Sequence, residues 1–342
     1  MDIIEHCSLL ERNTFGIAAT AARLMEYDSV EELQEFIWRR NADSDRSPLF
    51  HIGGGSNLLF LSDFEGTILH SRIRTIDVTA DEGESIYVRV GAGVVWDAFV
   101  QYAVDSQWYG LENLSLIPGE VGASAVQNIG AYGAEAKDFI LYVDAVNLLT
   151  GEVRHFTKEE CQYAYRQSIF KTALRGLYAV THVHFRLSHS FRPNLEYGAL
   201  RQALTKDGIE LYDLTAGQLR DHIISIRQNK LPDPKVLGNG GSFFKNPIVE
   251  RAVFERIARE YPEAPHYEVD AGHVKIPAGW MIEQCGWRGK SLGRAGVYEK
   301  QALVLVNLGG ATGQDIEQLC HAIQKDVLQR FGVAIDPEVN FI

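Results

Sequence analysis

The sequence predicts an α+β protein built from two or three domains. At 342 residues the chain exceeds the roughly 250 to 300 residues that one hydrophobic core usually holds. Segments with helical spacing of apolar residues occur beside short segments rich in β-branched and aromatic residues, which are typical of strands. The segment LPDP at 231–234 marks a candidate domain boundary, because its two prolines stop any helix.

The first elements expected are a helix and a strand–loop–strand unit. Residues 29–40 match a helix that begins with a capping box formed by Ser29 and Glu32. The apolar segment PLFHI at 48–52 predicts a strand, and strand character resumes in LLFL and GTILH after the intervening glycines. The glycine segment GGGSN is therefore expected to be a tight loop between two strands.

The middle of the chain combines strands with one unusually long loop. IYVRV at 86–90 predicts a strand, and the spacing of Val95, Phe99 and Tyr102 predicts a helix after it. Residues 114–133 hold four glycines without a sustained period, which indicates a long ordered loop with at most one short helix. Loops of this length inside compact domains are often functional.

The remaining segments predict a sheet, a helix and a mixed C-terminal unit. Strands are expected within 141–153, where TGE forms a turn, and within 177–188, and a helix is expected over 215–229. The last third predicts a helix with Val249, Val253, Ile257 and Tyr261 on one face. It also predicts a buried strand in ALVLVNL, and a helix that carries Ile316, Leu319, Ile323, Val327 and Phe331 and stops at Gly332.

Composition excludes several classes of function. A formal net charge of -12 and a pI near 5.4 would repel nucleic-acid backbones and anionic membranes, so neither is an expected partner. Four cysteines without a CxxC pair favour neither a disulfide framework nor a zinc site, and no metal is expected. The sequence shows no signal peptide and no apolar stretch near the ~20 residues of a membrane span, so a cytoplasmic protein is expected.

Several short motifs have two interpretations when taken alone. Three glycines after a buried strand can turn backbone amides toward one anion, so GGGSN is either a pyrophosphate loop or an ordinary turn. GAGVVW at 91–96 lacks the third glycine of a dinucleotide fingerprint, and GKS at 289–291 lacks the first glycine of a Walker motif. His182 and His184 alternate on a strand, as a metal pair might, but no third ligand of the right type lies nearby in sequence, which favours solvent-facing histidines.

Three residues are candidates for catalysis. Ser242 follows a glycine pair in GNGGSFFKNP without the GxSxG spacing of a nucleophile, which leaves an acid or hydrogen-bond donor as its functional interpretation, although a structural turn is the default for this motif alone. Arg166 stands among aromatic residues in YAYRQSIFK, where its fork of donors suits a carboxylate or phosphate, although a surface arginine fits equally well. Glu338 follows a proline among apolar residues that indicate a short strand and partial burial.

Taken together, ten segments resemble the UDP-N-acetylenolpyruvoylglucosamine reductase family, which acts in peptidoglycan precursor synthesis. In chain order they are NTFGI, GGGSN, IPGEVGASAVQNIGAYG, YRQSIFK, LEYGAL, KLPDPK, GSFFKNP, AGWMIEQCG, QALVLVN and PEV. They extend from Asn13 to Val339, nearly the whole chain. Each segment is weak alone, but their fixed order is not expected by chance, and LEYGAL points to the type I branch.

The resemblance implies a two-part FAD-binding module of the vanillyl-alcohol oxidase class and a C-terminal α+β substrate domain. The first FAD subdomain is expected over 1–72, with a strand from 333–342 returning to it. The second is expected over 73–230, including a tyrosine loop near 190–200, and the substrate domain over 231–332. A monomer is expected.

The resemblance also assigns site residues. Noncovalent FAD would be held by Gly53, Gly54, Gly55, Ser56, Asn57, Ile117, Pro118, Gly119, Gly122, Ser124, Asn128, Gly130, Ala131 and Tyr132. The UDP-sugar substrate would be held by Tyr197, Lys230, Asn246 and Gln301. The catalytic residues would be Arg166, Ser242 and Glu338.

The implied reaction proceeds in two halves. NADPH reduces the flavin and leaves, and the enolpyruvyl substrate then takes its place and accepts hydride at its methylene carbon. Arg166 and a protonated Glu338 would stabilise the enolate-like charge, and Ser242 would deliver the proton, assisted by Lys245 or a water. One departure is Asn340, because the family commonly has a basic residue there and alternate strand residues share a face, so the orientation or charge of Glu338 could differ.

Two rival functions follow from the same residues. A flavin oxidase of this module often attaches FAD through a histidine beside the phosphate loop, but here the loop is all glycine and His51 precedes it on the strand. A non-catalytic nucleotide-sugar binding module would need no proton donor, so the combination of Arg166, Ser242 and Glu338 argues against it.

Overall fold

The computed structural model describes residues 1–195 and 198–342. These residues form two compact units that interleave along the chain. Unit 1 comprises Met1–Cys7, Ala21–Gly54 and Phe64–Arg227, and unit 2 comprises Ser8–Thr20, Gly55–Asp63 and Gln228–Ile342. Both units mix helices with sheets, which confirms the α+β class. Among the helices described, none combines the length and the apolar character needed to span a membrane.

Unit 1 begins with a four-stranded sheet in the order β1-β2-β5-β3, in which β5 runs parallel to both of its neighbours. The strands are β1 (Asp2–Ser8), β2 (Thr20–Tyr27), β3 (Leu49–Ile52) and β5 (Phe64–Ser71). The predicted helix is present as α1 (Val30–Ala42), and the Ser29 hydroxyl caps it by accepting from Glu32 N. The reciprocal half of the capping box is absent from this helix, because the Glu32 carboxylate accepts from Asp28 N instead.

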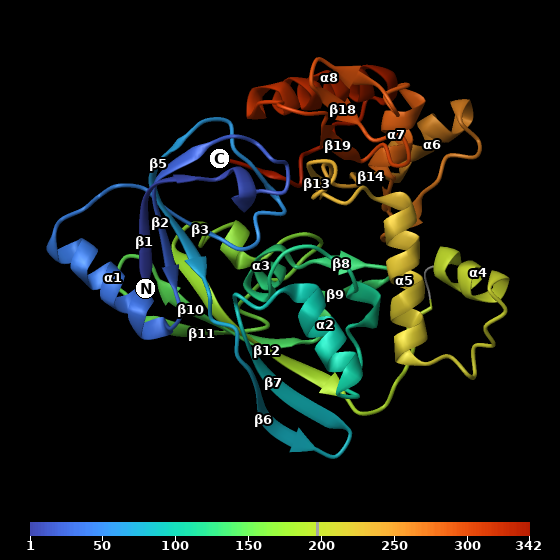
Figure 1. Cartoon of the computed structure of the whole chain (residues 1–342). Coiled ribbons are helices and arrows are strands. Elements are labelled where there is room, and N and C mark those ends of the chain that lie inside the picture. Colours follow the sequence, from blue (N-terminus) through green and yellow to red (C-terminus); the bar gives the residue numbers. More distant parts are fainter. Residues whose placement is uncertain (196–197) are drawn as a thin grey trace. The chain divides into compact units, whose positions relative to one another are not determined.

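The second sheet of unit 1 has five antiparallel strands in the order β11-β10-β12-β7-β6 (Figure 1). Its strands are β6 (Ile76–Glu82), β7 (Ser85–Gly91), β10 (Ile140–Asn147), β11 (Val153–Thr157) and β12 (Tyr178–Ser188). The middle strand β12 is buried on both faces over most of its length. A polar side chain on β12 therefore needs a protein partner.

His182 and His184 on β12 are a correction to the sequence prediction, because both are buried rather than solvent-facing. The Asp144 carboxylate hydrogen-bonds to His184 Nε2 (3.0 Å) and to His155 Nδ1 (2.7 Å). His182 Nδ1 lies 3.2 Å from the Arg89 guanidinium, and burial together with that cation lowers the pKa of His182 to about 4. Alternation put both histidines on one face, but it did not reveal that this face is covered.

The helix α2 (Trp96–Asp105) follows β7 as predicted, but a different face of it is buried. Trp96, Phe99, Val100 and Ala103 enter the core, while Val95 and Tyr102 are about half exposed. The loop at 114–133 contains one short helix, α3 (Val121–Gln127), as expected. Around it lie the short strands β8 (Gly130–Ala131) and β9 (Ala134–Glu135) and the 3-10 turns η2 (Glu112–Leu114), η3 (Ala136–Asp138) and η4 (Ile169–Lys171).

Two helices complete unit 1, α4 (Gly198–Lys206) and α5 (Ala216–Lys230), whose last three residues belong to unit 2. The predicted helix over 215–229 is thus confirmed, and it ends directly before the LPDP segment. Six apolar side chains join α4 and α5: Leu195, Leu200, Leu204, Leu214, Leu219 and Ile223.

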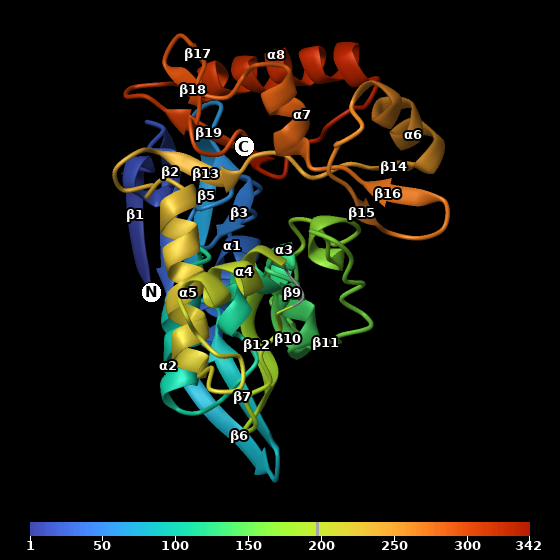
Figure 2. The ribbon, with the colours of Figure 1, turned by 90° about the vertical axis from the view of Figure 1, so that its right-hand side faces the viewer.

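Unit 2 contains an antiparallel sheet in the order β13-β19-β18-β17 and a three-stranded sheet in the order β14-β16-β15. The strands are β13 (Asn239–Ser242), β14 (Ile248–Glu250), β15 (Tyr267–Glu268), β16 (His273–Lys275), β17 (Ser291–Leu292), β18 (Ala295–Val297) and β19 (Val304–Asn307). Figure 2 shows α8 (Gly313–Phe331) running along β17, β18 and β19. Its predicted apolar face is buried, and Gly332 ends it in the left-handed conformation, as expected.

The remaining elements of unit 2 are η1 (Leu10–Arg12), α6 (Arg251–Glu260), α7 (Ala278–Gln284) and two paired strands, β4 (Leu58–Leu59) and β20 (Asn340–Phe341). The prediction for α6 was partly wrong, since Val249 lies in β14 and the helix buries Phe254 with Ile257. Strand β20 runs parallel to β4, so residues almost three hundred positions apart are neighbours.

Candidate active site

Two of the segments predicted to hold FAD meet in unit 1. A Cβ added to Gly53 would lie 3.1 Å from the Ala123 Cβ, and one added to Gly54 would lie 3.3 Å from the Gly119 Cα. The glycine loop therefore lies directly against the start of α3 and the residue before it. Side chains at these two positions would press on the facing segment and displace it slightly, so glycine allows the closest approach of the two segments.

The second loop is held close to the five-stranded sheet by backbone contacts. Val121 N donates to Val94 O (2.9 Å) and Gly122 N donates to Ala92 O (3.0 Å), and a Cβ on Gly122 would approach the Ala92 Cβ to 2.7 Å. A Cβ on Gly91 would lie 2.2 Å from Ile73 O, and one on Gly93 would lie 2.2 Å from Ser71 O. The glycines of the GAG segment at 91–93 therefore allow close packing of backbone segments, which agrees with an interpretation other than a dinucleotide fingerprint.

Two predicted FAD residues use their side chains inside the protein. The Asn128 amide is fully buried, donating to Ala164 O (2.9 Å) and to Glu135 Oε2 (3.1 Å). Ser124 Oγ donates to Val121 O (2.7 Å). Asn128 and Tyr132 also adopt positive φ, at 49° and 47°. Such backbone strain is concentrated at functional sites, so these residues shape the loop that FAD is predicted to meet.

Arg166 is brought to this loop. Its guanidinium donates to Gly130 O (2.6 Å) and reaches Asn128 O at 3.4 Å, and its own backbone has φ 54°. Lys171 Nζ donates to Arg166 O (3.2 Å) and to Gln127 Oε1 (2.5 Å), which fixes the Arg166 backbone. The arginine predicted to act on the substrate is therefore held by the segment predicted to hold the flavin.

A second arginine near this loop, Arg227 on α5, was missed by the sequence analysis. It donates to Leu116 O (3.3 Å), and burial lowers its pKa. Burial raises the pKa of Tyr132, while the neighbouring Arg227 guanidinium, which hydrogen-bonds to it, acts in the opposite direction. A signal was available, because Arg220 and Arg227 stand seven residues apart on the stripe of α5 that carries Leu219 and Ile223.

In unit 2 the glycine loop continues through Gly55, Ser56 and Asn57. Gly55 has φ 64°, and a Cβ there would lie 1.9 Å from Arg12 O. Only glycine fits that position. In the part of the chain that the structure describes, the N–H groups of Gly54 and Gly55 donate to no protein acceptor. An anion such as a pyrophosphate can therefore accept from them.

Ser242 stands at the end of β13 beside an irregularity in the pairing with β19. Gly241 adopts φ 71°, and its N–H donates to Asn239 Oδ1 (2.9 Å), which fixes the turn before the serine. Bulges of this kind re-aim side chains and are frequent beside active sites. The result is an exposed Ser242 side chain on a rigid backbone.

Glu338 and the glycine loop are tied to the same region. Glu338 N donates to Phe243 O (2.7 Å), directly after Ser242, and Asn57 Nδ2 donates to Glu338 O (3.2 Å). Glu338 is half-buried, as predicted. Asn340, the departure from the family pattern, donates through its side chain (3.1 Å) and its backbone (3.0 Å) to Asn57 O. It therefore helps to anchor the glycine loop.

The predicted substrate residues are only partly gathered. Asn246 Oδ1 accepts from Ala278 N (2.9 Å) at the start of α7, and Gln301 Oε1 lies 3.1 Å from where a Cβ on Gly279 would stand. Both side chains thus lie at the first turn of α7. Lys230 is the exposed last residue of α5. Tyr197 lies outside the described residues.

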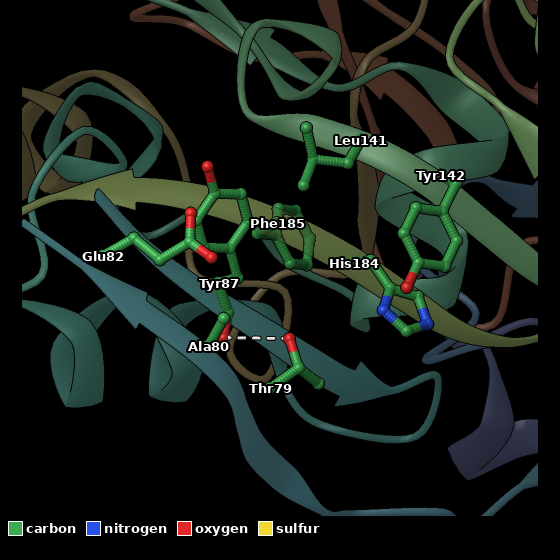
Figure 3. A pocket seen from close by; sticks show the side chains of 8 residues that line it. All are labelled: Thr79, Ala80, Glu82, Tyr87, Leu141, Tyr142, His184 and Phe185. Carbon is green, nitrogen blue, oxygen red and sulfur yellow. Dashed lines mark hydrogen bonds between the residues drawn. The ribbon is translucent and has the colours of Figure 1, made fainter.

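A separate hollow of about 280 Å³ opens on the five-stranded sheet (Figure 3). The Tyr142 ring stacks on the His184 imidazole there, with 3.8 Å between their centroids. Its lining consists of Thr79, Ala80, Glu82, Tyr87, Leu141, Tyr142, His184 and Phe185. None of the predicted site residues lines it. Within the described ranges, no group of three or more His, Cys, Asp or Glu side chains is arranged to hold a metal ion.

Comparison with known proteins identifies the family. Residues 21–157 match an FAD binding domain, and residues 233–342 match the UDP-N-acetylenolpyruvoylglucosamine reductase C-terminal domain. A UDP-N-acetylenolpyruvoylglucosamine reductase from Bacteroides fragilis (strain YCH46) is 56% identical over 335 residues, covering 98% of either chain. The chain belongs to the UDP-N-acetylenolpyruvoylglucosamine reductase family. It is therefore an FAD-dependent oxidoreductase, as the resemblance predicted.

Further members of the UDP-N-acetylenolpyruvoylglucosamine reductase family match along the whole length. A relative of the same name from Porphyromonas gingivalis (strain ATCC 33277) is 47% identical over 342 residues, which is 100% of either chain. The solved structure of the Thermus caldophilus UDP-N-acetylenolpyruvylglucosamine reductase superposes with a TM-score of 0.68 at 22% identity, covering 99% of this chain and 98% of the other. That likeness shows the shared fold.

Proposed function

We propose that this chain reduces UDP-N-acetylenolpyruvoylglucosamine to UDP-N-acetylmuramate with NADPH through noncovalently bound FAD, and that Arg166, Ser242 and Glu338 carry the reaction. Support comes from the full-length similarity to reductases of that name. The single observation that carries the residue assignment is the backbone network of unit 2. There, one set of hydrogen bonds links Asn57, the Ser242–Phe243 segment and Glu338.

FAD, when bound, would supply the hydride chemistry that connects NADPH to the methylene carbon of the enol ether. The glycine loop offers the amides of Gly54 and Gly55 to the pyrophosphate, and the segment 117–132 packs beside it through Gly119. The half-buried His51 has its Nε2 2.7 Å from the Tyr27 hydroxyl, and this engagement within the protein favours noncovalent attachment.

Arg166 stabilises charge that develops on the substrate. Hydride addition to the methylene carbon leaves negative charge on the adjacent carbon, which spreads into the carboxylate. A guanidinium held by Gly130 O is preorganised and loses little freedom when it meets this charge. Glu338 in its protonated form donates a hydrogen bond to the same intermediate.

Ser242 delivers the proton to the carbon that carries this charge. A hydroxyl is a weak acid, so its geometry matters more than its acidity, and the pairing irregularity beside Gly241 fixes it. Lys245, three residues on, provides positive charge near the serine, and its backbone N–H donates to Asp336 O (2.9 Å). The alkoxide left after transfer regains a proton from solvent or from Lys245.

The substrate site follows from the remaining residues. Asn246 and Gln301 at the first turn of α7, with Lys230 and Tyr197, are assigned to the diphosphate and sugar. We assign residues 1–72 and 73–230 to the two FAD subdomains, with residues 333–342 joining the first, and 231–332 to the substrate domain. We also propose a cytoplasmic monomer, which fits the net charge of -12 and the lack of a CxxC pair among the four cysteines.

The deciding experiment mixes the purified protein, NADPH and the UDP-enolpyruvyl sugar, and follows NADPH absorbance and the mass of the product. Consumption of NADPH that depends on the sugar supports the proposal. Oxygen-dependent turnover of a free sugar or alcohol would indicate an oxidase instead. Binding of the UDP-sugar without NADPH consumption would indicate a binding module. Sedimentation tests the monomer.

A further inference from the structure

A buried cluster of three ionisable side chains lies beneath the glycine loop in unit 1. His70 on β5 lies between Glu26 on β2 and Glu120, the residue before α3, and each of these residues is less than 9% exposed. His70 Nδ1 lies 2.8 Å from Glu26 Oε1, and His70 Nε2 lies 3.0 Å from Glu120 Oε1. None of these residues belongs to the site described above.

The geometry of this cluster favours a charged histidine. Both ring nitrogens face carboxylate oxygens, and only the imidazolium can donate from both. A neutral ring would direct a lone pair at one carboxylate. Burial opposes the charge on His70, whereas Glu120 and Glu26 favour it, and the net result is a raised pKa for His70. With His70 protonated, the three groups carry a net charge of about -1, which becomes about -2 when the proton leaves.

The cluster reaches the loop through Glu120. A Cβ on Gly53 would lie 3.3 Å from Glu120 Oε2, so the second oxygen of this carboxylate lies against the loop. The Glu120 side chain makes no capping hydrogen bond to α3. A carboxylate at this place repels an anion held by the loop unless a cation beside it compensates.

The other ionisable groups near the cluster do not provide that cation. On β2, Tyr27 is buried, and burial raises its pKa further above its usual value. On β3, burial lowers the pKa of His51 to about 3, which leaves it uncharged. Arg72, at the end of β5, has Nη1 3.8 Å from Glu26 Oε2, but it is also paired with Asp2 and Asp28. His70 is therefore the cation that contacts Glu120 directly.

We propose that His70 is a positioning residue whose positive charge compensates Glu120 beneath the triple-glycine loop, so that the FAD pyrophosphate is held tightly only while His70 is protonated. This inference rests on the proposed placement of the pyrophosphate at that loop. The doubly negative pyrophosphate favours the protonated cluster, so FAD binding raises the pKa of His70 by linkage. The FAD dissociation constant accordingly rises with pH between the His70 pKa values of the free and loaded protein.

The test is a titration of FAD-free protein with FAD between pH 6 and pH 9, read by flavin fluorescence. For the wild type we expect the dissociation constant to rise by about 10- to 100-fold across this range, the size expected for a charge change near an anion. His70→Gln binds weakly and independently of pH. Glu120→Gln binds tightly, and its dissociation constant rises less with pH than that of the wild type, because His70 still faces Glu26 but no longer compensates a carboxylate at the loop. His184→Gln is the matched control, since it also alters a buried histidine paired with a carboxylate, and it should keep the wild-type slope.

A structural role for the cluster predicts different results. A wild-type slope that persists in both His70→Gln and Glu120→Gln overturns the inference, as does tight binding by His70→Gln. Should His70→Gln fail to fold, as judged by its circular dichroism, the Glu120→Gln titration and the NMR shift of the His70 ring decide. That ring must titrate at higher pH in the FAD-loaded wild type than in the FAD-free protein, and an unchanged titration overturns the inference.

A loop variant separates this inference from the proposed site. Gly54→Asp places a carboxylate in the glycine loop and should weaken FAD binding strongly. Unchanged FAD affinity in Gly54→Asp overturns the proposed pyrophosphate site and the inference with it. Weakened affinity in Gly54→Asp, together with unaltered pH slopes in the cluster variants, overturns the role of His70 alone.

Discussion

Replacing Ser242 by alanine removes one hydroxyl and leaves the surrounding backbone intact. The turn is fixed by Gly241 N donating to Asn239 Oδ1 and by Phe243 N donating to Leu303 O (2.7 Å), and neither bond uses the hydroxyl. In residues 1–195 and 198–342 no hydrogen bond from the Ser242 hydroxyl to a protein group is formed. The free energy of unfolding should therefore change by less than about 0.5 kcal/mol, as for other surface substitutions.

The effect on catalysis should be large and confined to one half-reaction. A positioned acid contributes about 10²- to 10⁴-fold, which corresponds to roughly 3 to 5 kcal/mol of activation free energy. Stopped-flow absorbance of the flavin separates the halves. Reduction by NADPH should keep its wild-type rate in Ser242→Ala, while reoxidation by the enolpyruvyl substrate should slow by that factor. Ser291→Ala, an exposed serine on β17, is the matched control. Wild-type reoxidation in Ser242→Ala would refute the assignment of the proton donor.

Three further predictions concern strain, charge and pH. Gly55→Ala places a side chain on a left-handed backbone and against Arg12 O, so it should lower the free energy of unfolding by at least about 2 kcal/mol and release FAD. The control Gly83→Ala has a similar φ of 61° but open space around it, so it should lower the free energy of unfolding by only about 1 kcal/mol, as measured by thermal unfolding. Arg166→Lys keeps the positive charge but loses the planar guanidinium, so substrate reduction should slow by about 10²-fold while flavin reduction by NADPH keeps its rate. An equal slowing in the exposed control Arg175→Lys would contradict this prediction. Folding lowers the pKa of His182 from 6.5 to about 4. This shift corresponds to roughly 3 kcal/mol in the free energy of unfolding. That stability is present above pH 6.5 and is lost toward pH 4, because the unfolded chain takes up a proton there and the folded chain does not. Unfolding of His182→Gln should depend less steeply on pH across that interval, and an unchanged slope would contradict the burial argument.

Local signals in the sequence were sufficient for most elements. The capping serine of α1, the glycine that ends α8 and the β-branched segments of β10 and β12 each act through contacts close in sequence. The long glycine-rich loop was also predictable, because small residues without a period cannot form a regular helix or strand. The order of the ten motifs added the family, since no single motif fixes a function.

Burial and long-range pairing could not be predicted in the same way. The alternation of His182 and His184 gives a shared face of β12, but whether neighbouring elements cover that face depends on the three-dimensional fold. The spacing of Val95, Phe99 and Tyr102 predicts a helix, although the buried stripe of α2 is set by which side meets the sheet. Arg227 and Glu120 are polar residues whose partners come from distant segments, so their roles emerged only from the structure.

The pairing of β4 with β20 has a consequence for biosynthesis. The carbonyl of Asn57 accepts hydrogen bonds from Asn340, more than 280 positions later, so the second half of the glycine loop lacks these partners until Asn340 has been synthesised. Contacts of such sequence separation form late in folding. The loop and the strand that fixes it are therefore joined late, and a chain truncated before Asn340 would leave Asn57 O without these two donors.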